Sequence, residues 1–221
     1  MTIPASCLVP VGIARGSVGA AVATLQEWLV LHGHRVAVDG DFGPATEAAL
    51  VAYSERRVVD ATIAADLVAP MLRATTATGS IVDIARAHLA EHPREVGGNN
   101  RGPWVRLYAR AEGAGVLWCG YAAHYWAMQA GLVTAELVSP SCDITAARAR
   151  AVGRLSSVPT IGGLFLVRRN PGDWTHMGVV TGIGDGWVAT IEGNTNDDGG
   201  REGYEVCART RGVARLDFVR M

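Results

Sequence analysis

Four residues in the second half of the chain have the types and the order expected of a nucleophilic site. Cys119 lies at the start of an apolar, helix-like run, His176 and Glu192 follow in runs of β-type composition, and Asn194 lies just beyond Glu192. A thiolate is a strong nucleophile, and a helix N-terminus favours it through unpaired N–H groups and a partial positive charge. A histidine can take the thiol proton, and a polar third group fixes the imidazole's tautomer and orientation. This order of residues therefore predicts covalent catalysis by Cys119.

One hairpin decides whether the polar residues of the two β-type runs share a face of the sheet. If Gly184-Asp185-Gly186 forms a three-residue loop, His176 pairs with Asn194, and the alternation of strand side chains puts His176, Glu192 and Asn194 on one face. A loop of two or four residues shifts the register by one and puts them on opposite faces. The three-residue loop is therefore the turn that builds the site in this register prediction.

The elements around these residues indicate an α+β catalytic domain. Ser80 and Asp83 form a capping-box pattern that opens a helix ending before Pro93, and a further helix is expected near 104–111, ahead of the Cys119 helix. After about residue 160 the pattern changes to short β-type runs at 163–168, 176–182, 187–192, 204–209 and 213–218. Helices followed by an antiparallel sheet are typical of the α+β class.

The N-terminal part predicts a small three-helix domain. Amphipathic helices are expected over 17–31, 44–56 and 62–73, with Pro44 at a first helical position. Residues 75–80 are small and polar and are interpreted as a linker. The predicted organisation is a domain over 1–74 and a catalytic domain over 81–221.

The N-terminal part resembles the type 1 peptidoglycan-binding domain over about residues 10–73. The resemblance rests on Val38-Asp39-Gly40-Asp41-Phe42-Gly43-Pro44-Ala45-Thr46 together with the helix spacing around it. It departs at Tyr53-Ser54, where that family usually continues with an aromatic residue and a glutamine. The resemblance implies a three-helix fold that binds the bacterial cell wall.

Residues 83–218 resemble the CHAP family of cysteine, histidine-dependent amidohydrolases/peptidases, which cut peptidoglycan. The similar segments are Asn100-Arg101-Gly102-Pro103, Trp118-Cys119, His176-Met177-Gly178-Val179-Val180 and Ile191-Glu192-Gly193-Asn194. The resemblance implies a papain-like fold in which Cys119 is the nucleophile and His176 the general base. It also implies that Glu192 orients His176 and that Asn194 makes polar contacts near the site. The chain departs at Gly162-Gly163, where the family commonly has Gly-Asp.

The composition is that of a globular protein without an electrostatic signature for polyanions. The chain has 221 residues, 49% hydrophobic and 19% charged, with a net charge of −1. We therefore expect no nucleic-acid partner, and the lack of a long apolar run predicts no membrane insertion. The N-terminus lacks the pattern of a signal peptide, which favours synthesis in a host cytoplasm and action on the wall after release. A monomer is expected.

The sequence predicts no metal ion and no other cofactor. Its four widely spaced cysteines contain no CxxC pair, and Cys7, Cys142 and Cys207 are expected to be packing residues. A pattern from Asn194 through Asn196 and Asp198-Gly199 to Glu205 is similar to a calcium loop, but it begins with Asn and helices do not flank it. We therefore expect a solvated loop there.

The sequence as a whole predicts a two-domain peptidoglycan hydrolase. Cys119 would cleave an amide of the wall peptide, as an N-acetylmuramoyl-L-alanine amidase or an endopeptidase, and the design resembles a phage endolysin. The alternatives are an antibacterial amidase toxin injected into rival bacteria, a catalytically inactive cell-wall-binding protein, and a zinc amidase.

Overall fold

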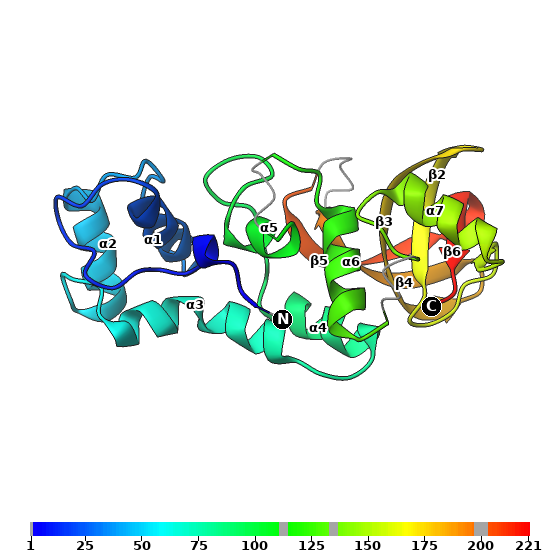
Figure 1. Cartoon of the computed structure of the whole chain (residues 1–221), viewed down its shortest axis with the longest axis horizontal. Helices are drawn as coiled ribbons and strands as arrows, with labels where there is room; N and C mark the ends of the chain where they lie inside the picture. Colours follow the sequence, from blue (N-terminus) through cyan, green and yellow to red (C-terminus); the bar gives the residue numbers. More distant parts are fainter. Residues whose placement is uncertain (1, 111–114, 133–136, 197–202) are drawn as a thin grey trace. The chain divides into compact units, whose positions relative to one another are not determined.

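The structure is a computed structural model that describes residues 2–110, 115–132, 137–196 and 203–221. The α+β fold class predicted from the sequence is confirmed (Figure 1). The described helices are α1 (Ala20–Leu31), α2 (Pro44–Ser54), α3 (Ala61–Thr76), α4 (Ile81–Ala90), α5 (Pro103–Tyr108), α6 (Cys119–Gln129) and α7 (Cys142–Ala151). The described strands are β1 (Leu155–Ser156), β2 (Leu164–Asn170), β3 (Asp173–Gly184), β4 (Trp187–Thr195), β5 (Glu205–Gly212) and β6 (Leu216–Val219).

The chain divides into two compact units, and two separate stretches of the sequence build the first. Unit 1 consists of Met1–Arg73 and Arg94–Gly115, and unit 2 of Ala74–Pro93 and Val116–Met221. Two contacts explain why residues 94–115 join the N-terminal helices. Trp104 on α5 packs edge-on against Trp28 on α1, with ring centroids 6.4 Å apart. Arg106 and Glu27 form a two-pronged ion pair, with N–O distances of 3.0 and 2.5 Å.

A buried glutamine holds the turn that carries the N-terminal motif. Gln26 on α1 is fully buried, and its Oε1 accepts hydrogen bonds from the N–H groups of Asp39 and Gly40. Its Nε2 donates to Asp39 Oδ1 at 2.8 Å and lies 3.0 Å from both Asp41 O and Thr46 Oγ1. Gly40 has a φ of 76°, a conformation that favours glycine. The motif is therefore a rigid turn fastened to α1.

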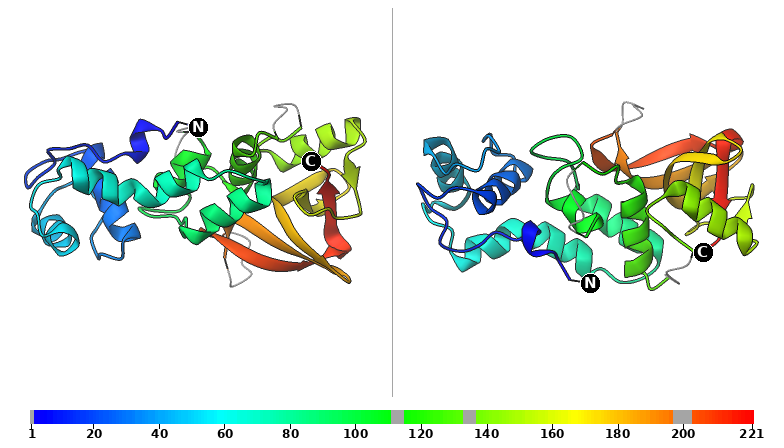
Figure 2. Two further views of the ribbon diagram at one scale, coloured as in Figure 1. Left: turned by 90° about the horizontal axis from the view of Figure 1, so that it is seen from below. Right: turned by 45° about the horizontal axis from the view of Figure 1, so that its top comes forward.

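Unit 2 is a six-stranded antiparallel sheet with helices on one face. The strand order is β1-β6-β2-β3-β4-β5. Helices α4, α6 and α7 cover one face of this sheet (Figure 2). Phe165, Val180, Val188, Leu216 and Phe218 form a buried cluster between neighbouring strands. The strands that carry the predicted site residues, β3 and β4, lie next to each other inside the sheet, where both have paired neighbours.

The β3–β4 hairpin reaches the predicted register by a different route. Gly184 pairs with Trp187, so the loop has two residues and the predicted three-residue loop is wrong. A β-bulge between Val180 and Gly182 then shifts the register by one residue. Beyond the bulge Val179 faces Ile191, which is the pairing that the three-residue loop would have produced. The bulge thus compensates for the shorter loop before the strands reach His176 and Glu192.

Candidate functional site

Cys119 is the first residue of α6. The residue is 8% exposed, and Trp118 before it has non-helical backbone angles. The first N–H groups of a helix have no intrahelical partners, and together with the helix dipole they favour negative charge at a helix start. The start of α6 also lies close to β4, because a Cβ on Gly193 would come within 2.7 Å of the Ala122 side chain. The glycine after Glu192 therefore allows the helix and the strand to approach.

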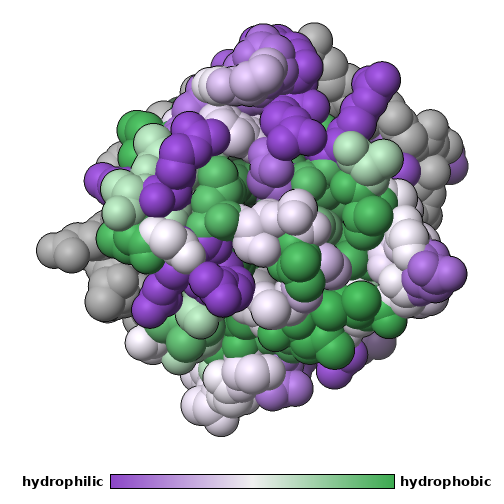
Figure 3. Space-filling view, turned by 90° about the vertical axis from the view of Figure 1, so that its right-hand side faces the viewer, coloured by the Kyte–Doolittle hydropathy of each residue, from purple (hydrophilic) through white to green (hydrophobic). Residues whose placement is uncertain are grey.

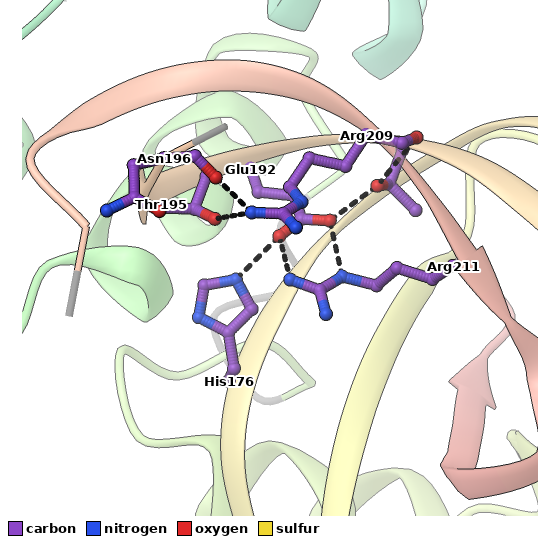
Figure 4. A network of polar contacts seen from close by, with 7 residues as sticks. His176, Glu192, Thr195, Asn196, Arg209 and Arg211 are labelled. Carbon is purple, nitrogen blue, oxygen red and sulfur yellow. Dashed lines mark hydrogen bonds and ion pairs between the residues drawn. The ribbon is translucent and has the colours of Figure 1, made fainter. Parts of the chain in front are cut away.

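His176 and Glu192 form a buried pair that Arg211 completes (Figure 4). His176 Nε2 lies 2.8 Å from Glu192 Oε2, and the Glu192 side chain is fully buried. Arg211 on β5 donates to both carboxylate oxygens, from Nε at 2.6 Å and from a terminal nitrogen at 2.5 Å. Thr190 donates a further hydrogen bond to Glu192 Oε1. The guanidinium of Arg211 also lies 5.3 Å from the centre of the Phe165 ring, which fixes its position.

The protonation states in this group favour a thiolate–imidazolium pair. Burial disfavours the charged form of Glu192, but hydrogen bonds from Arg211 and His176 outweigh it and lower the pKa to about 2. Burial likewise opposes protonation of His176, but the contacts with Cys119 and Glu192 raise its pKa to about 9. The pKa of Cys119 lies well below its usual range, because hydrogen bonds from Cys142 and His176 favour the thiolate more than burial disfavours it.

The hydrogen-bonding pattern assigns a role to each ring nitrogen of His176. Glu192 is ionised near neutral pH, so it accepts from the protonated Nε2 of His176. Cys119 is hydrogen-bonded to the same imidazole, which leaves Nδ1 for the thiol. Cys119, His176 and Glu192 are thus brought together, with the imidazole between the thiol and the carboxylate.

Asn194 lies beside this group but contacts the backbone ahead of the nucleophile. Its φ of 54° is left-handed, and the pairing of β4 with β5 shifts register between Glu192 and Thr195. With its amide oriented to suit its neighbours, Oδ1 accepts from the Trp118 N–H at 3.2 Å and Nδ2 donates to Gly203 O at 2.5 Å. Asn194 therefore supports the start of α6, whereas the register argument placed it beside His176.

The end of β4 is fastened to β5 by Arg209. Its guanidinium donates to Thr195 Oγ1 at 3.3 Å and to the backbone oxygen of Asn196 (Figure 4). The Arg209 carbonyl oxygen in turn lies 3.3 Å from Thr190 Oγ1. These contacts hold β4 at residues before and after Glu192.

Sequence reasoning missed two residues of the site, Arg211 and Cys142. The predicted strand over 204–209 ended before Arg211, whereas β5 extends to Gly212, so Arg211 fell outside the predicted elements. Cys142 was expected only to pack, but its thiol is hydrogen-bonded to Cys119. The proximity of Cys142 to Cys119 could not be predicted from the sequence, since α7 was not predicted.

No metal-binding cluster is found where the structure describes the chain. Among the described residues, no group of three or more His, Cys, Asp or Glu side chains is placed to hold a metal ion. The calcium-like pattern includes Asp198 and Gly199, which lie outside the described residues.

Unit 1 contains a cavity of about 250 Å³ beside the Asp39–Gly40 turn. Its polar lining comes from Glu27, Asp39, Asn100, Arg101 and Arg106. Asn100 is 6% exposed, and within the described residues its Oδ1 has no hydrogen-bond partner. Hydrogen bonds from the Asp41 N–H and from Gln26 lower the pKa of Asp39, so its carboxylate is ionised. The cavity therefore offers both charge signs and a side-chain amide.

The surface of unit 2 mixes residue types. The face in Figure 3 carries hydrophobic and hydrophilic residues side by side. Among the described residues, no helix has the length and apolar character needed to cross a bilayer.

Comparison with known proteins identifies part of unit 1. Residues 20–66 match a family model described as "Predicted Peptidoglycan domain". This stretch of the chain contains α1, α2 and the turn between them. The match supports a peptidoglycan-binding domain, association with the cell wall and peptidoglycan as a partner. Neither the search of curated proteins nor that of solved structures gave a match.

Proposed function

We propose that this protein is a peptidoglycan hydrolase of the CHAP type, in which Cys119 cleaves an amide bond of the wall peptide. The observation that carries the proposal is the arrangement of Cys119, His176 and Glu192. A buried, ionised carboxylate orients a histidine, and that histidine is hydrogen-bonded to a thiol at a helix N-terminus. The peptidoglycan domain over residues 20–66 supports the wall as the substrate.

In the first half of the proposed reaction the Cys119 thiolate attacks the amide carbonyl carbon. The electron pair of the carbonyl moves to oxygen, and the Cys119 N–H at the start of α6 is positioned to stabilise the oxyanion. The imidazolium of His176 then donates its Nδ1 proton to the amide nitrogen as the carbon–nitrogen bond breaks. The amine leaves, and the acyl group remains on Cys119 as a thioester.

In the second half water replaces the amine. Neutral His176 removes a proton from water, the hydroxyl oxygen attacks the thioester carbon, and the carbon–sulfur bond breaks. The acid product leaves, and the thiolate–imidazolium pair is restored. Throughout both halves Glu192 holds the Nε2 proton of His176 and stabilises the charged ring, while Arg211 keeps Glu192 ionised and oriented.

We also propose that the cavity beside the Asp39–Gly40 turn binds the wall. Its carboxylates, guanidinium groups and amide match the hydroxyl, acetamide and carboxyl groups of a muramyl peptide. Arg101 is exposed on this cavity and is the lining cation best placed to meet a ligand, because Arg106 is already paired with Glu27.

Removing Arg101 is expected to weaken wall binding. In full-length protein that also carries Cys119→Ser, Arg101→Ala should lower co-sedimentation with purified sacculi about 10-fold, the effect of losing one hydrogen bond to a charged group. The matched control is Arg57→Ala in unit 1, where Arg57 lies 3.2 Å from Glu47 and Arg15 remains to pair with that carboxylate. Equal losses in the two variants would show that the cavity does not bind the wall.

The same chemistry fits an endolysin-like protein made in a host cytoplasm or an injected antibacterial amidase. A catalytically inactive wall-binding protein would co-sediment with sacculi but release no fragments. A zinc amidase would lose activity with EDTA and resist iodoacetamide, the opposite of the response expected from Cys119.

A further inference from the structure

Two thiols meet at the candidate nucleophile. Cys119 begins α6 and Cys142 begins α7, and each residue is 8% exposed. The Cys142 thiol lies within hydrogen-bonding reach of the Cys119 sulfur. The thiol-containing ends of the two helices are therefore in contact, although 23 positions separate them in the sequence (142 − 119 = 23).

The backbone holds these helix starts together. A Cβ on Gly120 would lie 1.8 Å from Pro140 O, so only glycine lets the first turn of α6 approach the segment before α7. The start of α7 is fixed as well, since Ser141 Oγ caps it through the Ile144 N–H and Asp143 accepts from the Trp174 N–H at 2.7 Å. The two thiols are thus held close together by the backbone contact at Gly120 and by the hydrogen bonds at the start of α7.

We propose that Cys142 is a resolving thiol, which closes a reversible disulfide with Cys119 when a peroxide oxidises the nucleophile. The Cys119 thiolate attacks one peroxide oxygen, the O–O bond breaks, and Cys119 becomes a sulfenic acid. The leaving hydroxide takes the proton of the His176 imidazolium and becomes water. The Cys142 sulfur then attacks the Cys119 sulfur. The S–S bond forms, the S–O bond breaks, and the Cys142 proton leaves with the hydroxyl as water. Two thiols are oxidised and one peroxide is reduced to two waters.

The consequence for the proposed hydrolase is an off state that a thiol reductant reverses. Cys119 cannot attack an amide while it is bonded to Cys142, and the disulfide protects it from irreversible oxidation to the sulfinic acid. This consequence rests on the proposed function, whereas the disulfide itself is a property of the protein that is detected without any substrate.

The test is intact-mass analysis of the reduced full-length protein after treatment with hydrogen peroxide. We expect each chain to lose two hydrogen atoms, peptide mapping without reductant to link Cys119 to Cys142, and dithiothreitol to restore the original mass. A gain of oxygen in place of the hydrogen loss, or a link between another pair of cysteines, would overturn the proposal.

Two variants sharpen the test. Cys142→Ala should gain one and then two oxygen atoms on Cys119, and dithiothreitol should not reverse the second gain. Cys207→Ala is the matched control, because Cys207 is as exposed as Cys142, at 8%, and should still form the disulfide. If the link forms but the reduced protein releases nothing from sacculi, the resolving role stands and the proposed function fails. If the reduced protein hydrolyses sacculi but no link between Cys119 and Cys142 forms, the proposed function stands and the resolving role fails.

Discussion

Cys119→Ser is expected to abolish the release of fragments from purified sacculi, with a rate loss on the order of 10⁴-fold or more. The hydroxyl of serine is far less acidic than the thiol, and His176 is tuned to pair with a thiolate. Fold stability should be nearly unchanged, because oxygen replaces sulfur at a residue that is 8% exposed. Turbidity of a sacculus suspension measures the rate, and circular dichroism with a melting curve measures the fold.

The control for this prediction is Cys7→Ser. Cys7 is fully buried in unit 1, donates from its thiol to Pro103 O at 3.3 Å, and has a pKa that burial raises to about 11. A serine keeps that hydrogen bond, so we expect full activity. Iodoacetamide at neutral pH should accordingly label Cys119 and spare Cys7. A folded Cys119→Ser protein that still clears sacculi would rule out the thiol mechanism.

The second large loss of rate is expected when His176 is replaced. Replacing Glu192 should also lower the rate, by a factor that depends on pH. His176→Ala removes the proton carrier and should lower the rate about 10²–10⁴-fold. Glu192→Gln removes the negative charge that stabilises the imidazolium. It also leaves the Arg211 guanidinium beside the imidazole without its ion-pair partner. The pKa of His176 should then fall from about 9 toward its ordinary value of 6.5.

The sign of this shift sets the pH window. A histidine is protonated below its pKa, so the wild-type rate should fall as the pH rises through about 9. In Glu192→Gln the fall should come at lower pH, with a loss of up to about 30-fold at pH 8 and little loss from this cause at pH 6. Thr190→Val is the control, because it removes a hydrogen bond to Glu192 and leaves the charge in place. Equal losses of Glu192→Gln at both pH values would contradict the assigned role of Glu192.

Several elements of the fold were predictable because their signals are local, whereas α7 was not predicted. The capping box at Ser80 and Asp83 is present, with Asp83 N donating to Ser80 Oγ at 3.3 Å, and α2 begins at Pro44 as expected. The β3–β4 register was predicted through a wrong loop, and a bulge restored it. A bulge depends on packing against neighbouring strands, which a single strand's residue pattern does not reveal.

The site was predictable only in part, because some of its members depend on tertiary contacts. Cys119, His176 and Glu192 have recognisable types and order. Arg211 reaches Glu192 from a neighbouring strand, and Cys142 reaches Cys119 from a helix that has a weak apolar pattern. The contact of Asn194 with the Trp118 N–H goes together with a positive φ at Asn194, a feature that residue type alone does not specify.

Mass spectrometry of the material released from purified sacculi tests the central claim most directly. With reduced full-length protein we expect soluble fragments in which one water has been added per cleaved amide, giving a new amine and a new carboxyl group and no new reducing sugar ends. The same incubation with Cys119→Ser should release none of them. New reducing ends, or identical fragments from the Cys119→Ser protein, would contradict amide cleavage by a Cys119 nucleophile.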